Sequence, residues 1–234
     1  MKKELLIQKN PKSPIAETFR TLRTNLQFMN AKNGLQTILI TSTVPGEGKT
    51  WVSSNLAVTF ALTGKKVLLI DADMRKGRIA KVFQARPTPG LSNFLSGINA
   101  NDNIETRSGV LNFVQTTGVD NLYVMTSGNI PPNPAELLET DVTVNMIEEL
   151  KEKFDIVIFD GTPSMLVTDA TILSRLVDTT VIVSAYNLTK KEDLVKVKRN
   201  IENVGGKIAG VVFNKVPGKS KAYRYGYYYG HPEK

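Results

Sequence analysis

Cysteine is absent from the 234 residues, and histidine occurs only once. The lack of thiols excludes disulfide scaffolds, zinc–thiolate sites and thiol nucleophiles, and one histidine all but excludes a histidine metal cluster or a Ser–His triad. No apolar run approaches the roughly 18 residues of a membrane-spanning helix. Residues 1–13 are polar and basic and lack the continuous apolar segment of a secretory signal, so we expect a cytoplasmic chain.

Acidic residues are the minority among the charged ones. Lys and Arg number 30 against 22 Asp and Glu, which gives a net charge of +8. This excess favours an anionic partner such as a nucleotide, a nucleic acid, an anionic lipid or an acidic protein segment, and it does not choose among them. The length suits one domain. We expect an extended N-terminal arm over 1–13, a domain over 14–216 and a flexible tail over 217–234.

Hydrophobic periodicity predicts alternating strands and helices. Ser13 and Pro14 are a typical helix start, and an apolar stripe follows at helical spacing: Ile15, Phe19, Leu22 and Leu26. Continuous apolar runs predict buried strands over 36–41, 66–70, 122–126, 156–159, 181–184 and 208–213, and helical patterns lie at 49–63, 90–96, 134–139, 141–153, 168–176 and 190–204. Such alternation is typical of an α/β fold in which helices flank both faces of a mostly parallel central sheet.

The segment between the first strand and the next helix is rich in glycine. Its sequence over 43–50 is TVPGEGKT, and glycines there let backbone N–H groups approach phosphates at the N-terminus of the helix. Lys49 is expected to reach the β- and γ-phosphates, and Thr50 to bind Mg²⁺. The strict phosphate-loop pattern has glycine at the position of Thr43, and the alternative is a structural glycine turn. The Glu47 side chain is expected to face solvent. The predicted nucleotide-binding residues of this segment are Val44, Pro45, Gly46, Glu47, Gly48, Lys49, Thr50 and Trp51.

Carboxylates follow two other apolar strands. Asp71 and Asp73 follow the strand at 66–70, and Asp160 follows the strand at 156–159. The carboxyl ends of parallel strands line the ligand crevice of an open α/β sheet. These groups are therefore placed to hold a hydrated Mg²⁺ and a reacting hydroxyl. The alternative is that they only cap the helices that come next.

Several blocks along the chain carry a resemblance to a known family. They are ILITSTVPGEGKT, NLAVTFALTGKKVLLIDADMR, GLSNFL, SGNIPPNPAELL, FDIVIFD and the tyrosine-rich end. Together they resemble the deviant P-loop ATPases of cell division and plasmid partition. More closely, they resemble the bacterial tyrosine kinases that regulate capsular and exopolysaccharide synthesis. The resemblance implies a P-loop NTPase fold, with ATP and Mg²⁺ as cofactors.

The resemblance also implies roles for the candidate catalytic residues. Lys49 and Thr50 would serve ATP and Mg²⁺. Asp71 and Asp160 would organise the metal with Thr50, and Asp71 or Asp73 would accept the proton of the tyrosine hydroxyl.

The resemblance implies roles for two further residues. Arg75 would be a positive partner near the phosphates. Asn214 matches a position that contacts adenine in related ATPases, with a strand-end cap as the alternative.

The chain also departs from the patterns of its relatives. Lys76-Gly77 stands where a proline is usual, and Gly161-Thr162-Pro163 stands where two prolines are usual, which puts the local loop geometry in question. Val44 stands where partition-type relatives have a second lysine, which disfavours that branch.

Glu17, Arg20 and Arg23 match a family motif that makes subunit contacts in a ring-shaped oligomer. On a helix the three lie on one flank, away from the apolar stripe, where they are free to meet a neighbour. The alternative is an ordinary solvated face with an ion pair between positions i and i+3.

Five tyrosines lie among glycines and basic residues near the end of the chain: Tyr223, Tyr225, Tyr227, Tyr228 and Tyr229. Without apolar neighbours they cannot form a core. The resemblance implies that they are autophosphorylation sites. The alternatives are a stacking platform for nucleic-acid bases and an end without a role.

The implied function is that of an ATP-dependent protein-tyrosine kinase that phosphorylates its own tail in trans. It would regulate the synthesis and export of capsular or extracellular polysaccharide. The resemblance further implies a homo-oligomeric ring, a membrane-embedded activator of the polysaccharide co-polymerase type, a place at the inner face of the plasma membrane through that partner, a tyrosine phosphatase, and no nucleic acid. Two alternatives stay open: a partition- or division-type ATPase switch without kinase activity, and a basic nucleic-acid binder.

Overall fold

The computed structural model describes residues 5–29, 34–97 and 109–217. The five tyrosines predicted as phosphorylation sites lie outside the described residues, as does all of the predicted tail after residue 217.

A seven-stranded sheet forms the middle of the molecule. In the order in which they lie side by side, the strands are β3 (Gln115–Thr116), β4 (Leu122–Met125), β2 (Val67–Asp71), β5 (Ile156–Pro163), β1 (Thr37–Ser42), β6 (Thr179–Ala185) and β7 (Ile208–Asn214). Every neighbouring pair is parallel except β3 with β4. Because β1 lies between β5 and β6, the glycine-rich segment that follows it emerges near the middle of the sheet.

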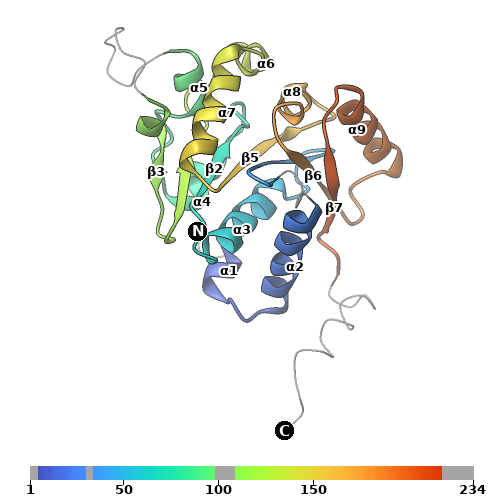
Figure 1. Ribbon diagram of the computed structural model, residues 1–234. Coiled ribbons are helices and arrows are strands. Elements are labelled where there is room, and N and C mark those ends of the chain that lie inside the picture. The colour runs from blue at the N-terminus through green and yellow to red at the C-terminus, as the bar shows by residue number, and fades with distance from the viewer. Residues whose placement is uncertain (1–4, 30–33, 98–108, 218–234) are drawn as a thin grey trace.

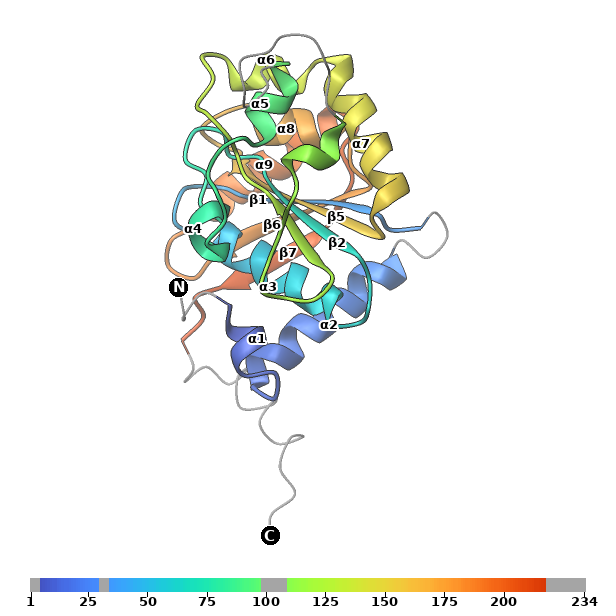
Figure 2. The same ribbon diagram turned by 90° about the vertical axis from the view of Figure 1, so that its left-hand side faces the viewer.

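Helices cover both faces of this sheet (Figures 1 and 2). One face carries α1 (Leu6–Lys9), α2 (Pro14–Met29), α3 (Lys49–Ala61) and α4 (Ile79–Phe83). The other carries α5 (Leu91–Leu95), the 3₁₀ helix η1 (Val110–Phe113), α6 (Pro134–Leu138), α7 (Asp141–Lys153), α8 (Asp169–Ser174) and α9 (Lys191–Asn203). The predicted α/β architecture is confirmed. Within the described ranges, no helix combines the length and the apolar character needed to cross a membrane.

The predicted strands and helices are all present, with ends that differ by a few residues. The largest difference is in β5, which continues from Phe159 through Pro163. Four elements escaped prediction, namely α1, α4, η1 and β3. Each has five residues or fewer, so a hydrophobic period is hard to recognise, although α5 and α6 are equally short and were predicted.

The N-terminal segment is not the extended arm that its polarity predicted. Its described part contains α1, in which Leu5 and Ile7 are buried against the domain. The Ile7 N–H donates to the Asn55 side-chain oxygen on α3 at 3.2 Å. These contacts dock the segment on α3, and the Gln8 side-chain amide also donates to the Gly118 carbonyl oxygen at 3.0 Å.

Helix α2 forms as its sequence predicts. The Ser13 hydroxyl accepts the N–H of Ala16 at 3.2 Å, which caps the first turn. Of the predicted stripe, Phe19 and Leu26 are buried and the other two side chains pack partly buried against the same core. The stripe therefore faces the domain, as expected.

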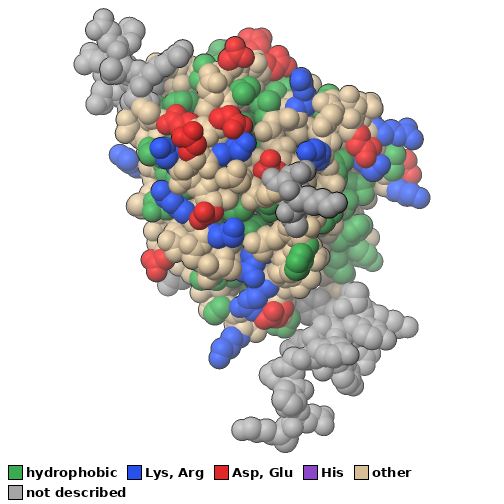
Figure 3. Space-filling view, in the orientation of Figure 1, with side chains coloured by type: hydrophobic (Ala, Val, Ile, Leu, Met, Phe, Trp, Pro, Cys, Tyr) green, Lys and Arg blue, Asp and Glu red, His purple; other side chains and the backbone are tan. Residues whose placement is uncertain are grey.

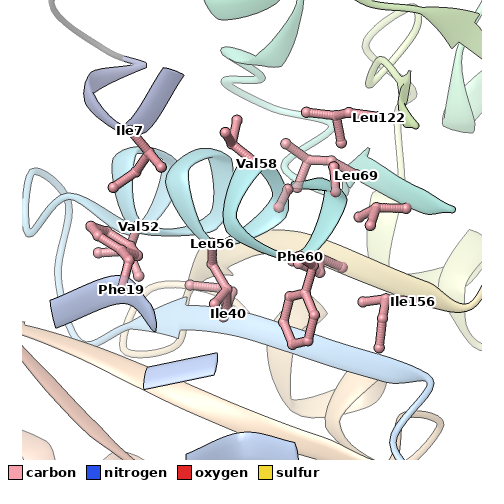
Figure 4. Packing of buried hydrophobic residues seen from close by; sticks show 14 of the residues in the cluster. Ile7, Phe19, Ile40, Val52, Leu56, Val58, Phe60, Leu69, Leu122 and Ile156 are labelled. Carbon is pink, nitrogen blue, oxygen red and sulfur yellow. The ribbon is translucent and has the colours of Figure 1, made fainter. Parts of the chain in front are cut away.

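Helix α3 is enclosed on nearly all sides, because it lies between α2 and the sheet. Its Leu56 and Phe60 side chains point toward β1, where Ile40 lies, and Val52 approaches Phe19 of α2 (Figure 4). Leu56, Phe60 and Ile40 are fully buried. This packing fixes the direction of α3 and, with it, the position of the glycine-rich loop at its N-terminus.

Replacing Phe60 by alanine should lower the free energy of unfolding by about 3–5 kcal/mol, because it leaves a cavity between α3 and β1. Urea unfolding measures the change. The matched control is Leu62→Ala, two residues further along, where the side chain is 57% exposed and the expected change is under about 1 kcal/mol. Equal losses in the two variants would contradict this account of the core.

Candidate functional site

The glycine-rich loop turns sharply between β1 and α3. Gly46 and Gly48 have φ angles of +84° and +99°, in the region that favours glycine. A Cβ atom at Gly48 would lie 2.1 Å from the side-chain nitrogen of Asn214. The backbone conformation favours glycine at this position, and any larger residue would also displace the Asn214 side chain.

The Glu47 side chain does not face solvent, so that expectation is wrong. It is fully buried and turned toward the start of its own loop. Its carboxylate accepts the N–H of Thr43 at 2.6 Å, the N–H of Val44 at 3.0 Å and the Thr43 hydroxyl at 2.7 Å. The departure from glycine at position 43 is thus accommodated, because the threonine hydroxyl has a partner inside the loop.

The predicted lysine and carboxylates converge at the carboxyl edge of the sheet. Asp71 on β2 and Asp160 on β5 are neighbours in register, and Asp73 follows β2. The Lys49 ammonium group lies 3.2 Å from an Asp73 oxygen. Burial alone lowers the pKa of Lys49, but the charges of Asp160, Asp73 and Asp71 outweigh it and raise the pKa above its ordinary value. Lys49 is therefore held as a largely buried cation, with 12% of its side chain exposed.

Burial acts in the opposite direction on the carboxylates. It raises the pKa of Asp71 to about 7, with a further contribution from the charge of Asp160 and an opposing one from the Ile79 N–H, which donates to Asp71 at 2.8 Å. Burial also raises the pKa of Asp160, against the charge of Lys49 and the hydroxyl groups of Thr50 and Ser53. The site thus stores unfavourable charge that a bound cation would relieve.

The donor set fits a magnesium ion that keeps most of its water. One Asp71 oxygen and both Asp160 oxygens are buried without a hydrogen-bond partner of normal geometry, although the Thr50 and Ser53 hydroxyls lie near Asp160. Within the described ranges no cluster of three or more acidic or histidine side chains is arranged to hold a metal alone. Mg²⁺ is commonly bound by one or two carboxylates together with water and substrate phosphates, which matches this arrangement.

A cavity of about 680 Å³ opens beside the loop. Eight of the predicted site residues line it: Pro45, Gly46, Gly48, Lys49, Thr50, Trp51, Asp73 and Arg75. Val44, Glu47, Asp71, Asp160 and Asn214 were predicted for the site as well, but they do not line the cavity. Sequence reasoning missed the wall formed by α4 and the turn before it, which contributes Lys76, Arg78, Lys81 and Val82. The basic run over 75–78 is the signal that could have indicated this wall.

Arg75 is fixed by a residue that the sequence did not single out. Its guanidinium group lies 3.3 Å and 3.4 Å from the two carboxylate oxygens of Asp169, at the start of α8. Asp169 is fully buried, whereas the Arg75 side chain is 40% exposed. The pair therefore holds one positive group at the cavity wall.

The two departures from the family's prolines have geometric reasons. A Cβ atom at Gly77 would lie 2.3 Å from the Ser127 hydroxyl and 2.7 Å from an Asp71 oxygen. A Cβ atom at Gly161 would lie 2.8 Å from the Leu39 side chain on β1. Glycine therefore lets the chain pass close to Asp71 at position 77 and close to β1 at position 161.

Asn214 reaches the loop. Its side-chain amide donates to the carbonyl oxygen of Glu47 at 2.8 Å, and its own side-chain oxygen accepts the N–H of Lys215 at 2.9 Å. The end of β7 therefore lies against the phosphate loop. Contact with an adenine base stays a prediction.

The three residues of the oligomer motif are less free than their helix flank suggested. Glu17 and Arg20 form an ion pair with each other, and Arg20 also donates to the carbonyl oxygen of Pro11 at 2.6 Å. Arg23 donates to the carbonyl oxygen of Thr59 on α3 at 3.1 Å. Contacts with a second subunit stay a prediction.

A glycine loop after β1, a buried lysine, and carboxylates at the ends of β2 and β5 define a P-loop nucleotide-binding protein. Consistently, a family model described as an AAA domain matches residues 35–209. The chain is 39% identical to the tyrosine-protein kinase YwqD of Bacillus subtilis (strain 168), over 97% of this chain and 92% of that protein. It is 42% identical to a putative tyrosine-protein kinase in the cps region of Klebsiella pneumoniae, over 93% of this chain and 29% of that protein.

Among solved structures, the kinase domain of the Escherichia coli tyrosine kinase ETK superposes with a TM-score of 0.85 at 32% identity. The match covers 93% of this chain and 82% of that one. The chain therefore belongs to the bacterial tyrosine-protein kinases of the P-loop type.

The raised pKa of Asp71 predicts a pH-dependent stability of the nucleotide-free protein. Between the ordinary pKa of 3.8 and the folded value of about 7, the folded state holds a proton that the unfolded state has released. The free energy of unfolding therefore falls as pH rises through this interval. Asp71→Asn should be more stable than the native protein at pH 8, by an amount on the order of 1 kcal/mol or more, with little difference near pH 4.

Urea unfolding without nucleotide or metal at the two pH values measures this difference. Asp120→Asn, which changes an exposed carboxylate, is the control and should show no such gain. A stability gap at pH 8 that persists unchanged at pH 4 would contradict the assignment to Asp71.

Proposed function

We propose that this chain transfers the γ-phosphoryl group of ATP to tyrosine hydroxyls, above all those near its own C-terminal end. The observation that carries the proposal is the largely buried Lys49 ammonium group, held beside three carboxylates where the glycine loop enters α3. Family membership supports tyrosine as the acceptor. The sequence supplies Tyr223, Tyr225, Tyr227, Tyr228 and Tyr229 shortly after the last described residue.

In the proposed reaction, the tyrosine oxygen bonds to the γ-phosphorus as the bond to the bridging oxygen of ADP breaks. The phenol proton passes to a carboxylate, for which Asp71 and Asp73 are the candidates. Of these two, Asp73 lines the cavity and lies 3.2 Å from the Lys49 ammonium group, whereas Asp71 is also assigned to the metal. Phosphoryl transfer depends mainly on positioning and charge neutralisation. The Lys49 ammonium group already lies in the site and supplies a positive charge there.

The same proposal assigns the remaining residues. Thr50, Asp71 and Asp160 would hold Mg²⁺, which would neutralise charge on the phosphates. The loop from Val44 to Trp51 would enclose the phosphates, Arg75 would add a positive group at the wall, and Asn214 would lie beside the adenine. The cavity supports the assignments of Thr50 and Arg75, which line it, and the unpaired carboxylate oxygens support those of Asp71 and Asp160.

Lys49→Met should abolish phosphotyrosine, because the substituted side chain carries no charge to the phosphates. The purified chain is incubated with Mg·ATP, with and without a peptide from the cytoplasmic end of a membrane activator, and phosphate is mapped by mass spectrometry. Lys153→Met, an exposed site at the end of α7, is the control and should keep native activity. Phosphotyrosine at the native level in Lys49→Met would refute the proposed site.

Transfer in trans is tested by mixing. The Lys49→Met chain is made with a heavy-isotope label and incubated with unlabelled native chain and Mg·ATP. Phosphate on the labelled tyrosines is expected if one chain modifies another. Phosphate confined to the unlabelled chain would limit the reaction to cis.

We further propose that copies of the chain assemble through α2 into a ring. Glu17, Arg20 and Arg23 lie on this helix, and the side chains of Phe28 and Met29 near its end are 76% and 60% exposed. Hydrophobic side chains also gather on the face shown in Figure 3, at the edge where β7 lies. The exposed residues of that strand are Val211 and Phe213. Exposed apolar groups of this kind support a protein–protein contact.

The double variant Glu17→Ala with Arg20→Ala should shift the assembly toward single chains of 25.8 kDa, measured by light scattering. The control is Glu148→Ala with Lys151→Ala, which removes an ion pair of the same i,i+3 spacing on α7. Complete phosphorylation of the native tail should also lower the assembly mass, because each phosphate adds about −1.5 to −2 charges to a basic segment. An assembly that keeps its mass in both tests would refute the proposal.

The wider role that we propose is regulation of the synthesis and export of capsular or extracellular polysaccharide. A membrane-embedded activator would bring the chain to the inner face of the plasma membrane, and a tyrosine phosphatase would reverse the modification; no nucleic acid is needed. The division into an N-terminal segment (1–13), whose described part is docked on α3 rather than extended as an arm, a kinase domain (14–216) and a substrate tail (217–234) belongs to the same proposal. ATP hydrolysis without phosphotyrosine would instead favour a partition-type ATPase switch.

A further inference from the structure

The carboxylate of Glu47 receives hydrogen bonds from two separate segments. Within its own loop it accepts two N–H groups and one hydroxyl, from Thr43 and Val44. From outside the loop it accepts the hydroxyl of Thr189, which lies between β6 and α9. A fully buried negative charge is costly unless donors surround it, and here four donors converge on one group.

The Thr189 hydroxyl is itself fixed in direction. Its oxygen accepts the N–H of Ala185, the last residue of β6, at 2.8 Å, and its proton is therefore directed to Glu47. The Thr189 N–H also donates to the Ala185 carbonyl oxygen at 3.1 Å. The phosphate loop is thus fastened, through one carboxylate and one hydroxyl, to the end of β6.

The backbone of Glu47 makes a second connection, to β7. Its carbonyl oxygen accepts the Asn214 side-chain amide at 2.8 Å, and the Asn214 carbonyl oxygen accepts the N–H of Tyr186 at 3.0 Å. One residue of the loop therefore joins the ends of β6 and β7 to the segment that leaves β1. These ends lie on the side where the adenine is proposed to bind.

We propose that Glu47 is a positioning residue that holds the phosphate loop in its nucleotide-binding shape and couples it to the segment after β6. The inference rests on the proposed ATP site and goes beyond it by assigning this residue a specific effect. A loop with two glycines at positive φ loses much conformational freedom when it is ordered. Hydrogen bonds that order it before the ligand arrives reduce the cost of binding. Because Thr189 donates to the same carboxylate, the affinity of the loop for phosphates also depends on the segment between β6 and α9.

Three variants of the full-length chain separate this role from a general effect on folding. Glu47→Gln keeps the shape but replaces one acceptor oxygen by a donor. Thr189→Val keeps the shape but loses the hydroxyl, and Thr189→Ser keeps the hydroxyl. The control is Thr143→Val, which removes a buried hydroxyl bound to the Leu137 carbonyl oxygen at 2.9 Å on the other face of the sheet.

Binding of Mg·ATP and of Mg·tripolyphosphate is measured by calorimetry. It is also followed by the fluorescence of Trp51, the single tryptophan, which lines the cavity and packs edge-on against Phe19 at 5.3 Å. Glu47→Gln should weaken both ligands about 10- to 100-fold, the effect of losing hydrogen bonds to a charged group. Thr189→Val should weaken Mg·ATP about three- to tenfold and Mg·tripolyphosphate less, and Thr189→Ser should restore native affinity.

In steady-state assays both weakened variants should raise the KM for ATP more than they lower kcat. Native affinity in Glu47→Gln and Thr189→Val would overturn the proposal, as would a Thr189→Ser variant no better than Thr189→Val, or equal weakening in Thr143→Val. Should Glu47→Gln fail to fold, the pair at position 189 decides alone.

The native chain separates this inference from the proposed function. Native protein that binds Mg·ATP with the expected variant effects but forms no phosphotyrosine would overturn the kinase reaction and leave the role of Glu47 in place. Native protein that binds no Mg·ATP would overturn both.

Discussion

The burial of one lysine among three aspartates at the edge of a parallel sheet is the interaction on which the site depends. Moving such charges out of water is costly, and their mutual attraction offsets this cost only in a fixed geometry. The raised pKa values of Asp71 and Asp160 show that the carboxylates are not fully compensated by Lys49. The geometry is therefore imposed from outside the site, by the continuous apolar packing of β1, β2 and β5 and of α3 above them.

The same packing separates the negative groups of the site from its positive groups. The carboxylates of Asp71 and Asp160 lie on buried strands beneath the loop, whereas the wall at α4 carries exposed cations, Arg78 and Lys81 among them. A nucleotide triphosphate with its metal, as proposed, would suit this separation, because a metal would be attracted to the carboxylates and phosphates to the loop and the cationic wall. This separation of charges follows from the topology. Carboxylates at the ends of neighbouring parallel strands lie together at one edge of the sheet, whereas the basic residues 75–78 lie in the turn that leaves β2.

Much of the fold was predictable because its main elements are long and strongly patterned. The strands of the parallel sheet are continuous apolar runs, and α7 was predicted with its observed ends, 141–153. The positions of Lys49, Asp71 and Asp160 were predictable for the same reason, because side chains that follow neighbouring parallel strands lie together at one edge of the sheet. The Arg75–Asp169 pair was not, because it joins residues 94 positions apart and no local pattern marks it. Nor was the burial of Glu47, because a charged residue in a glycine loop ordinarily faces water.

Thr43 and Glu47 are best understood as one feature rather than two. At the position of Thr43 the strict phosphate-loop pattern has glycine, so the loop must accommodate an additional side chain there. In this chain its hydroxyl turns inward and meets the Glu47 carboxylate at 2.7 Å, while the same carboxylate binds the Thr43 N–H. The apparent departure from the pattern therefore brings its own compensation: the threonine adds a hydroxyl donor to the backbone N–H that any residue would supply there, and both help to make a buried carboxylate tolerable at the base of the loop.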